Sequence, residues 1–354
     1  ELFTPGDRAA ARQMLGSAVA QLRQGADPAA LATALYNLGE AANLQGNYAE
    51  VQTYVAEGLE LYRAVGERWG IAAGLIQLGY NASARSNFPA ALALFRESRD
   101  LWHELHNQGG RAEALIAIGW IAWIQGEFSE LVAIFSEVRG LAQARGDQGA
   151  ADWALNRLGW AAWARSDFER ATALFEENWA TALALGSRTR VAWAMSGLAH
   201  VALSQGDEVW ARSLFEQSLE SFRETGYKVD IHWALNNLGR ACAGQGERER
   251  AVALFAEALA QSMARGDRWN VAAALEGLAL LDLAAQAAEC ARLLGAAAAL
   301  REQIAAPLWP CFWPEYERAV AALRRRLGAA AYASAWAAGQ SLQLDAAVAE
   351  ARAL

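Results

Sequence analysis

The chain has 354 residues, 54% of them hydrophobic, and a formal net charge of -8 at neutral pH. Its apolar fraction consists mainly of alanine and leucine, a composition typical of helical proteins. The acidic balance argues against nucleic acid as a direct partner, and no apolar run is long enough to cross a bilayer. Three irregularly spaced cysteines do not make a disulfide framework, which favours the reducing cytoplasm.

The first predicted element is a helix over Asp7–Gln24, where apolar residues recur at helical spacing. It aligns with the second helix of the later units, so we expect the array to begin with a lone second helix and to be part of a larger protein. From Asp27-Pro28, which favours a helix start, a pattern repeats every 40 residues. Its most regular apolar position holds Leu38, Leu78, Ile118, Leu158, Leu198, Leu238 and Leu278. Such a fixed period predicts a solenoid of stacked helix pairs.

Each unit is predicted to hold two helices separated by short turns. The first helix carries a Leu-Gly pair, and the second carries an alanine four residues before a phenylalanine, as in Ala171 and Phe175. Between units, Gly146-Asp147 is an example of a glycine that ends one helix and an acidic residue that caps the next. We therefore expect an all-α, right-handed solenoid of about seven 40-residue helix pairs over residues 1–286.

A C-terminal helical cap is predicted over residues 287–354, because the last repeat of a solenoid would otherwise expose its apolar stacking face. Three prolines (Pro307, Pro310 and Pro314) interrupt the repeat rhythm there, and two or three short helices are expected to follow them. Three tryptophans of this segment are expected to pack within the cap: Trp309, Trp313 and Trp336.

The spacing Leu155-x2-Leu158-Gly159-x2-Ala162, followed by Ala171-x3-Phe175, resembles the tetratricopeptide signature. The units are longer than usual and lack its first aromatic residue, so they form a divergent version. Long units of this kind, and the cap sequence from Ala288, resemble the sensor regions of STAND-class signalling ATPases and of LuxR-type, maltose-activator-like transcriptional regulators. The resemblance implies a non-catalytic, cytoplasmic sensor of a small-molecule inducer, a peptide or a protein effector.

In tetratricopeptide arrays the first helix of each unit lines the concave wall, and three of its positions face a ligand. The first position holds Trp153, Trp193 and Trp233. The second position holds Tyr80, Trp120, Trp160, His200 and Arg240. The third position holds Trp123 and Trp163, while Asn156 and Asn236 share the same face and Glu113 lies near its start. These residues predict an aromatic groove with a few orienting polar groups, which is the usual makeup of a binding site.

A structural explanation competes with this one, because tryptophan also fills gaps between long helices. The outer units hold Thr33, Ala73 and Ala273 at the corresponding position, so packing of the array does not demand an indole there, and this favours binding. A further set of tryptophans lies off this face and is expected to be structural: Trp69, Trp102, Trp179, Trp210 and Trp269.

Two other functions remain open at this stage. The same surface would also suit a protein–protein scaffold that docks a partner helix or the parent protein's own ATPase core. An enzyme is disfavoured, because its only concave polar candidates (Glu113, His200 and Arg240) are spread over several units. No catalytic residue, metal site or cofactor is expected, since the sequence has no phosphate-binding loop and no convincing metal-ligand spacing.

Overall fold

The computed structural model describes residues 5–25, 27–43, 47–85, 87–225 and 231–353. Over these ranges all regular structure is helical and no strand occurs, so the predicted all-α class is confirmed. The chain forms two compact units, Glu1–Ala122 and Trp123–Leu354, and each is described by itself. In the described part of the chain, no helix combines the length and apolar character needed to span a membrane.

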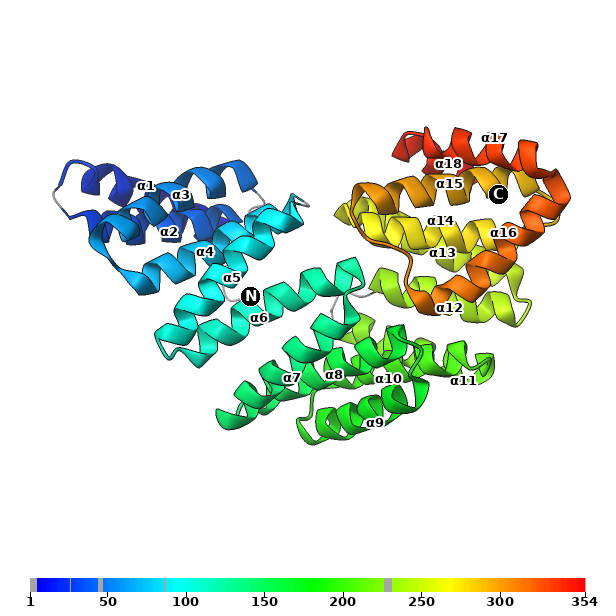
Figure 1. Cartoon of the computed structure of the whole chain (residues 1–354), viewed down its shortest axis with the longest axis horizontal. Coiled ribbons are helices and arrows are strands. Elements are labelled where there is room, and N and C mark those ends of the chain that lie inside the picture. Colours follow the sequence, from blue (N-terminus) through cyan, green and yellow to red (C-terminus); the bar gives the residue numbers. More distant parts are fainter. Residues whose placement is uncertain (1–4, 26, 44–46, 86, 226–230, 354) are drawn as a thin grey trace. The chain divides into compact units, whose positions relative to one another are not determined.

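The first unit is a series of antiparallel helices in which each packs on the next, from α1 to α5 (Figure 1). Its core is built from apolar residues such as Val55, Leu59 and Leu75. The helices are α1 (Pro5–Leu22), α2 (Pro28–Asn43), α3 (Tyr48–Val65), α4 (Arg68–Ala84), α5 (Phe88–Glu104) and α6 (Gln108–Gln125), of which α6 ends inside the second unit. The helix starts at Pro28, Arg68 and Gln108 repeat the 40-residue period of the sequence.

The second unit continues the same plan, with each helix from α7 to α15 packed on its successor. Figure 1 shows α12, α13, α14 and α15 side by side in this order. The even-numbered helices are the first helices of the units, and they also contact one another, from α8 to α10, α12 and α14. The helices are α7 (Phe128–Ala144), α8 (Gln148–Ala164), α9 (Phe168–Ala184), α10 (Arg188–Ser204), α11 (Glu208–Glu224), α12 (Ile231–Gly244), α13 (Arg248–Arg265), α14 (Arg268–Leu281) and α15 (Ala287–Gln303).

The C-terminal segment closes the end of the second unit. It contains the 3-10 turn η1 (Pro310–Phe312) and the helices α16 (Trp313–Leu327), α17 (Ala329–Gln340) and α18 (Leu344–Ala351). Helix α17 packs on α15, and α18 packs on both α14 and α15. A Cβ added at Gly339 would lie 1.9 Å from the Arg292 carbonyl oxygen, so glycine is needed where the backbones of α15 and α17 meet.

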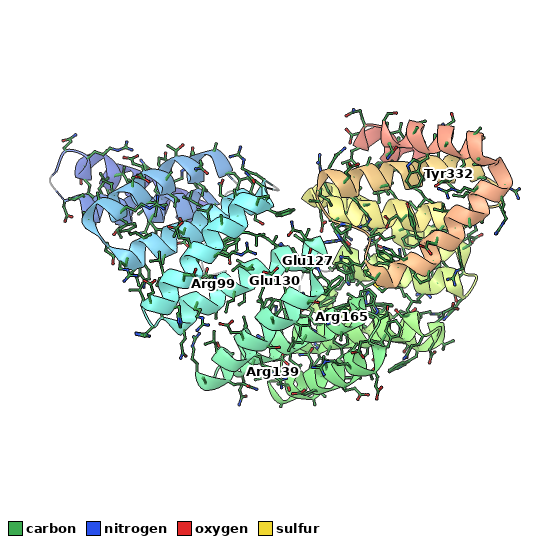
Figure 2. All side chains as sticks on the ribbon, viewed as in Figure 1. Arg99, Glu127, Glu130, Arg139, Arg165 and Tyr332 are labelled. Atoms are coloured by element: carbon green, nitrogen blue, oxygen red, sulfur yellow. The ribbon has the colours of Figure 1, made fainter. Side chains whose placement is uncertain are left out.

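The repeat sequence explains how the helices stack. Phe175 of α9 is fully buried, and its ring occupies the space that Cβ atoms would need at Gly159 of α8 and Gly197 of α10. One phenylalanine therefore fixes the contact between two successive first helices. The predicted caps are also present: the Asp147 carboxylate accepts a hydrogen bond from the Ala150 N–H at 2.9 Å, and Gly146 adopts a φ of +69°. Figure 2 shows Glu127 and Glu130 at the start of α7, where acidic groups suit the helix dipole.

Candidate functional site: an aromatic cluster and its cavity in the second unit

Aromatic side chains from five successive first helices, α6 to α14, meet in the second unit. Because the period is 40 residues, Trp160 of α8 and His200 of α10 lie at equivalent points of adjacent helices, and their ring centroids are 4.7 Å apart. The imidazole of His200 stacks on Trp233 at 5.2 Å, while Trp163 meets Trp160 edge to face at 5.5 Å. We call this set the aromatic cluster; it comprises Trp123, Trp160, Trp163, His200, Trp233, Trp269 and Trp309.

Trp309, from the non-helical segment before η1, covers the cluster. Its ring centroid lies 4.2 Å from that of Trp123 and 5.1 Å from that of Trp269, and the indole is only 1% exposed. The expectation that Trp309 packs within the cap was wrong, as was the placement of Trp269 away from the inner rings. The aromatic surface is therefore filled by the chain itself, and Trp160 and Trp163 are buried beneath it.

Two indoles of the cluster, Trp160 and Trp163, are held by hydrogen bonds within the second unit. Trp160 Nε1 donates to Asn156 Oδ1 at 3.0 Å, and Asn156 Nδ2 donates to Asn178 Oδ1 at 2.9 Å. Trp163 Nε1 donates to Ser204 Oγ at 2.9 Å. The indoles thus have fixed orientations, and Asn156, which is fully buried, serves the packing of α8 against α9.

His200 is a neutral imidazole at the centre of the cluster. It is 1% exposed, and burial lowers its pKa to about 3 because the charged form is penalised in an apolar environment. Its Nδ1 lies 2.7 Å from the Ser196 carbonyl oxygen, so in the neutral ring Nδ1–H donates and Nε2 is an acceptor. Among the described residues no donor makes a hydrogen bond of standard geometry with Nε2, and the Asn237 amide lies nearby.

The pKa of His200 predicts a pH dependence of stability. Below the unfolded-state pKa near 6.5, the unfolded chain binds a proton that the folded chain does not, so stability falls as the pH drops toward 3. We expect His200→Phe to flatten the slope of unfolding free energy against pH between 4.5 and 6 by up to about 1.4 kcal/mol per pH unit. Urea unfolding of both proteins across this range measures the difference; equal slopes would contradict it.

A cavity of about 720 Å³ adjoins the aromatic cluster. Residues of the helices α8 to α14 supply its walls, and η1 and α16 close it. Its lining combines apolar rings with polar and charged groups, among them Trp163, His200, Ser204, Arg240, Phe312 and Glu315. Three of the residues predicted to bind a ligand thus share this cavity. Cys311 also lines it, and burial raises the pKa of this thiol to about 12, which keeps it protonated.

Arg240 connects the repeat helices to the C-terminal segment. Its guanidinium carbon lies 4.4 Å from the Phe312 ring centroid, and its Nη1 lies 3.3 Å from Glu315 Oε2. The Arg240 side chain is 11% exposed, whereas Glu315 is 47% exposed. A cation that is largely shielded from water therefore faces the cavity with one distant and well-hydrated carboxylate as its partner.

The other predicted residues of the second unit lie outside the cluster. Trp153 meets Phe135 edge to face at 5.2 Å and lies under the guanidinium of Arg157. Trp193 is half-buried on α10. Asn236 is buried, and its Nδ2 donates to the Asn270 carbonyl oxygen at 3.2 Å, which ties α12 to α14.

The first unit holds the remaining three predicted residues. Trp120 is 53% exposed on α6, and Tyr80 is 37% exposed on α4. Glu113 also lies on α6, where desolvation and the nearby Glu40 raise its pKa. Desolvation, followed by the charge of Glu113, raises the pKa of Tyr80 to about 12. The structure thus brings Tyr80 and Glu113 near each other within this unit.

The sequence reasoning missed Trp269, Trp309 and Phe312, which complete the cluster and its cavity. The available signal was three aromatic residues placed among three prolines between Pro307 and Pro314. Such a segment cannot continue a helix, so its rings need another apolar surface. Across the described residues, no group of three or more His, Cys, Asp or Glu side chains could hold a metal ion.

Comparison with known proteins supports the helical-repeat architecture. Residues 190–264 match the family model described as tetratricopeptide repeat, and no curated protein matches the chain. A Rap protein complexed with competence and sporulation factor is 12% identical with a TM-score of 0.67, covering 98% of this chain and 94% of its own.

Two further solved structures show the same likeness. The Rap conjugation gene regulator of plasmid pLS20, in complex with a Phr peptide, is 14% identical with a TM-score of 0.56, covering 75% of this chain and 78% of its own. The apo form of the quorum sensor NprR from B. thuringiensis is 9% identical with a TM-score of 0.56, covering 90% of this chain and 94% of its own. At these identities the likeness shows a shared fold, which is a tetratricopeptide-like array of helix pairs.

Proposed function

We propose that this chain is a non-catalytic sensor module that binds a peptide or small-molecule effector in the cavity beside the aromatic cluster. The observation that carries the proposal is the makeup of this cavity. Its volume of about 720 Å³ lies within the range of known ligand sites. It joins the apolar rings of Trp163 and Phe312 to a hydroxyl at Ser204 and a guanidinium at Arg240.

A peptide is the favoured effector class. Two of the structural neighbours are complexes, a Rap protein with competence and sporulation factor and a Rap conjugation gene regulator with a Phr peptide. Because Trp309 covers the aromatic surface, a ligand would reach the cluster where it borders the cavity, at Trp163 and His200. In this proposal Trp160, Trp233 and Asn156 shape the site from beneath and do not touch the effector.

The wider setting follows from the sequence. The resemblance to the sensor regions of STAND-class ATPases and LuxR-type regulators supports a parent protein with further domains, working in the cytoplasm. Effector binding would then bias that parent between resting and active states, provided the effector binds the two states with different affinity. This segment itself would make no direct nucleic-acid contact, given its net charge of -8.

Affinity selection from a library of random short peptides tests the proposal. Ala243 lines the cavity, so Ala243→Trp should obstruct it, while Leu183→Trp adds an indole at a 61% exposed site elsewhere on the second unit. We expect wild type and Leu183→Trp to enrich the same peptides, as identified by mass spectrometry, and Ala243→Trp to enrich none of them. Equal enrichment by all three proteins, or none by the wild type, would rule out peptide binding at this cavity.

A protein-docking scaffold is the second candidate, and the first unit favours it. Trp120 and Tyr80 expose large rings there, and exposed aromatic surface commonly marks a protein contact. In that case Trp120→Ala would abolish capture of a protein partner in a pull-down, and Ala243→Trp would leave it intact. The opposite pattern would assign the partner to the cavity.

A further inference from the structure

The charges around the cavity are incompletely paired. Three arginines line it (Arg240, Arg248 and Arg318), against two carboxylates (Glu208 and Glu315). Arg248 is already engaged, because its Nη2 lies 3.0 Å from Asp282 Oδ2. Glu208 lies beside the end of α12, where a Cβ on Gly244 would be 2.4 Å from its Oε1. With Arg248 engaged, the remaining lining charges are Arg240 and Arg318 against Glu208 and Glu315, and the two guanidinium groups open to an anion are those of Arg240 and Arg318.

Arg240 is weakly satisfied by its present partner. A guanidinium has five N–H donors and binds a carboxylate best through two parallel hydrogen bonds. Here a single contact of 3.3 Å joins it to Glu315, and nearly half of the Glu315 side chain remains exposed to water. A second carboxylate could take the place of Glu315 at Arg240 without leaving Glu315 buried and unpaired.

Arg318 is placed to share the same anion. It follows Glu315 by three residues on α16, so the two side chains project from neighbouring turns of one face. Arg318 is exposed, lines the cavity and makes no ion pair with any residue that the structure describes. A carboxylate between Arg240 and Arg318 would meet two guanidinium groups, one from α12 and one from α16.

His200 adds a third recognition element. Its ring lines the cavity and it is almost completely buried. Its Nε2 makes no hydrogen bond of standard geometry with the described residues, although the Asn237 amide lies nearby. A ligand N–H would satisfy this atom. The C-terminal residue of a peptide offers both features together, since its backbone carries a carboxylate and an amide N–H. Its side chain can pack against Trp163 and Phe312.

Building on the proposed function, we infer that the cavity binds the C-terminal carboxylate of a peptide, held by Arg240 and Arg318 in place of Glu315. Glu315 is then an internal carboxylate that occupies the anion position until the effector arrives. In this role Glu315 competes with the ligand for Arg240. If it only held Arg240 in position, it would help ligand binding instead.

The test compares N-acetyl-L-phenylalanine with N-acetyl-L-phenylalaninamide, which differ only in the charge of the carboxyl end. Binding to the full chain is measured by isothermal titration calorimetry. We expect the acid to bind about tenfold or more tightly than the amide, and Arg318→Gln to remove most of this preference. Arg240→Gln should remove it as well, whereas Arg326→Gln, at an exposed site on the same helix outside the cavity, should leave it unchanged.

The direction in which Glu315→Gln changes the affinity for the acid is the decisive result. We expect this variant to bind the acid several-fold more tightly than the wild type and the amide equally well. Weaker or unchanged binding of the acid would overturn the inference, as would equal binding of acid and amide or no binding of either. Equal binding that Ala243→Trp abolishes would overturn the carboxylate role alone and leave the proposed function standing. Melting temperatures identify any variant that fails to fold. In that case the comparison of acid and amide binding by Arg318→Gln decides, because a substitution at this exposed site should not disturb folding.

Discussion

Trp309→Ala is expected to lower the free energy of unfolding of the second unit by about 3–5 kcal/mol, the usual cost of truncating a buried tryptophan. The indole is 1% exposed and touches rings from α6, α8, α12 and α14. Its segment lies outside any helix, so few backbone hydrogen bonds hold it in place. The side chain is therefore the main attachment between the repeat helices and the segment that closes the cavity.

Trp313→Ala is the matched control for this prediction. Trp313 lies four residues away and is 51% exposed, and its Nε1 donates one hydrogen bond to the Leu308 carbonyl oxygen. Its loss should cost about 1 kcal/mol or less. Urea unfolding followed by circular dichroism gives both values, and a red shift of tryptophan emission in Trp309→Ala would report the opened cluster. If the two variants unfold at the same urea concentration, Trp309 does not hold the segment.

The architecture was predictable because its signals are local and periodic. A leucine recurring every 40 residues fixes the unit length, and Ala171 with Phe175 identifies the buried face of a second helix. Asp147 marks a helix start by its own capping chemistry. The capping and buried-face inferences need only residues within one unit, the unit length needs only the comparison of successive units, and each was confirmed in the structure.

The closed state of the aromatic cluster was not predictable in the same way. Equivalence of Trp160 and His200 follows from the period, so their proximity could be foreseen. Trp309 reaches the same place from a segment without repeats, and no periodic rule says which surface its ring will cover. The cavity could not be predicted from the sequence either, because it depends on how η1 and α16 pack near α12. Whether the predicted residues bind a ligand remains a prediction for the experiments above.

The second large effect is expected at the buried ion pair that joins the last two stacked helices. Arg301 of α15 binds Glu276 of α14 through two hydrogen bonds, Nε to Oε1 at 2.6 Å and Nη2 to Oε2 at 2.8 Å. The two side chains are only 8% and 3% exposed. Arg301→Met should lower the free energy of unfolding by about 3–5 kcal/mol, because the carboxylate of Glu276 is then buried without a counter-charge.

A double-mutant cycle separates this loss of pairing from simple loss of packing. In the double variant Glu276→Met with Arg301→Met no unpaired charge remains, so its stability should recover to within about 2 kcal/mol of the wild type. Arg139→Met is the control: Arg139 pairs with Glu177 on the surface, where it is labelled in Figure 2, and its loss should cost less than about 1 kcal/mol. If the unfolding free energies lost in the two single variants simply add up in the double variant, the pair contributes through packing. Coupled charges would instead make the second substitution restore stability that the first removed.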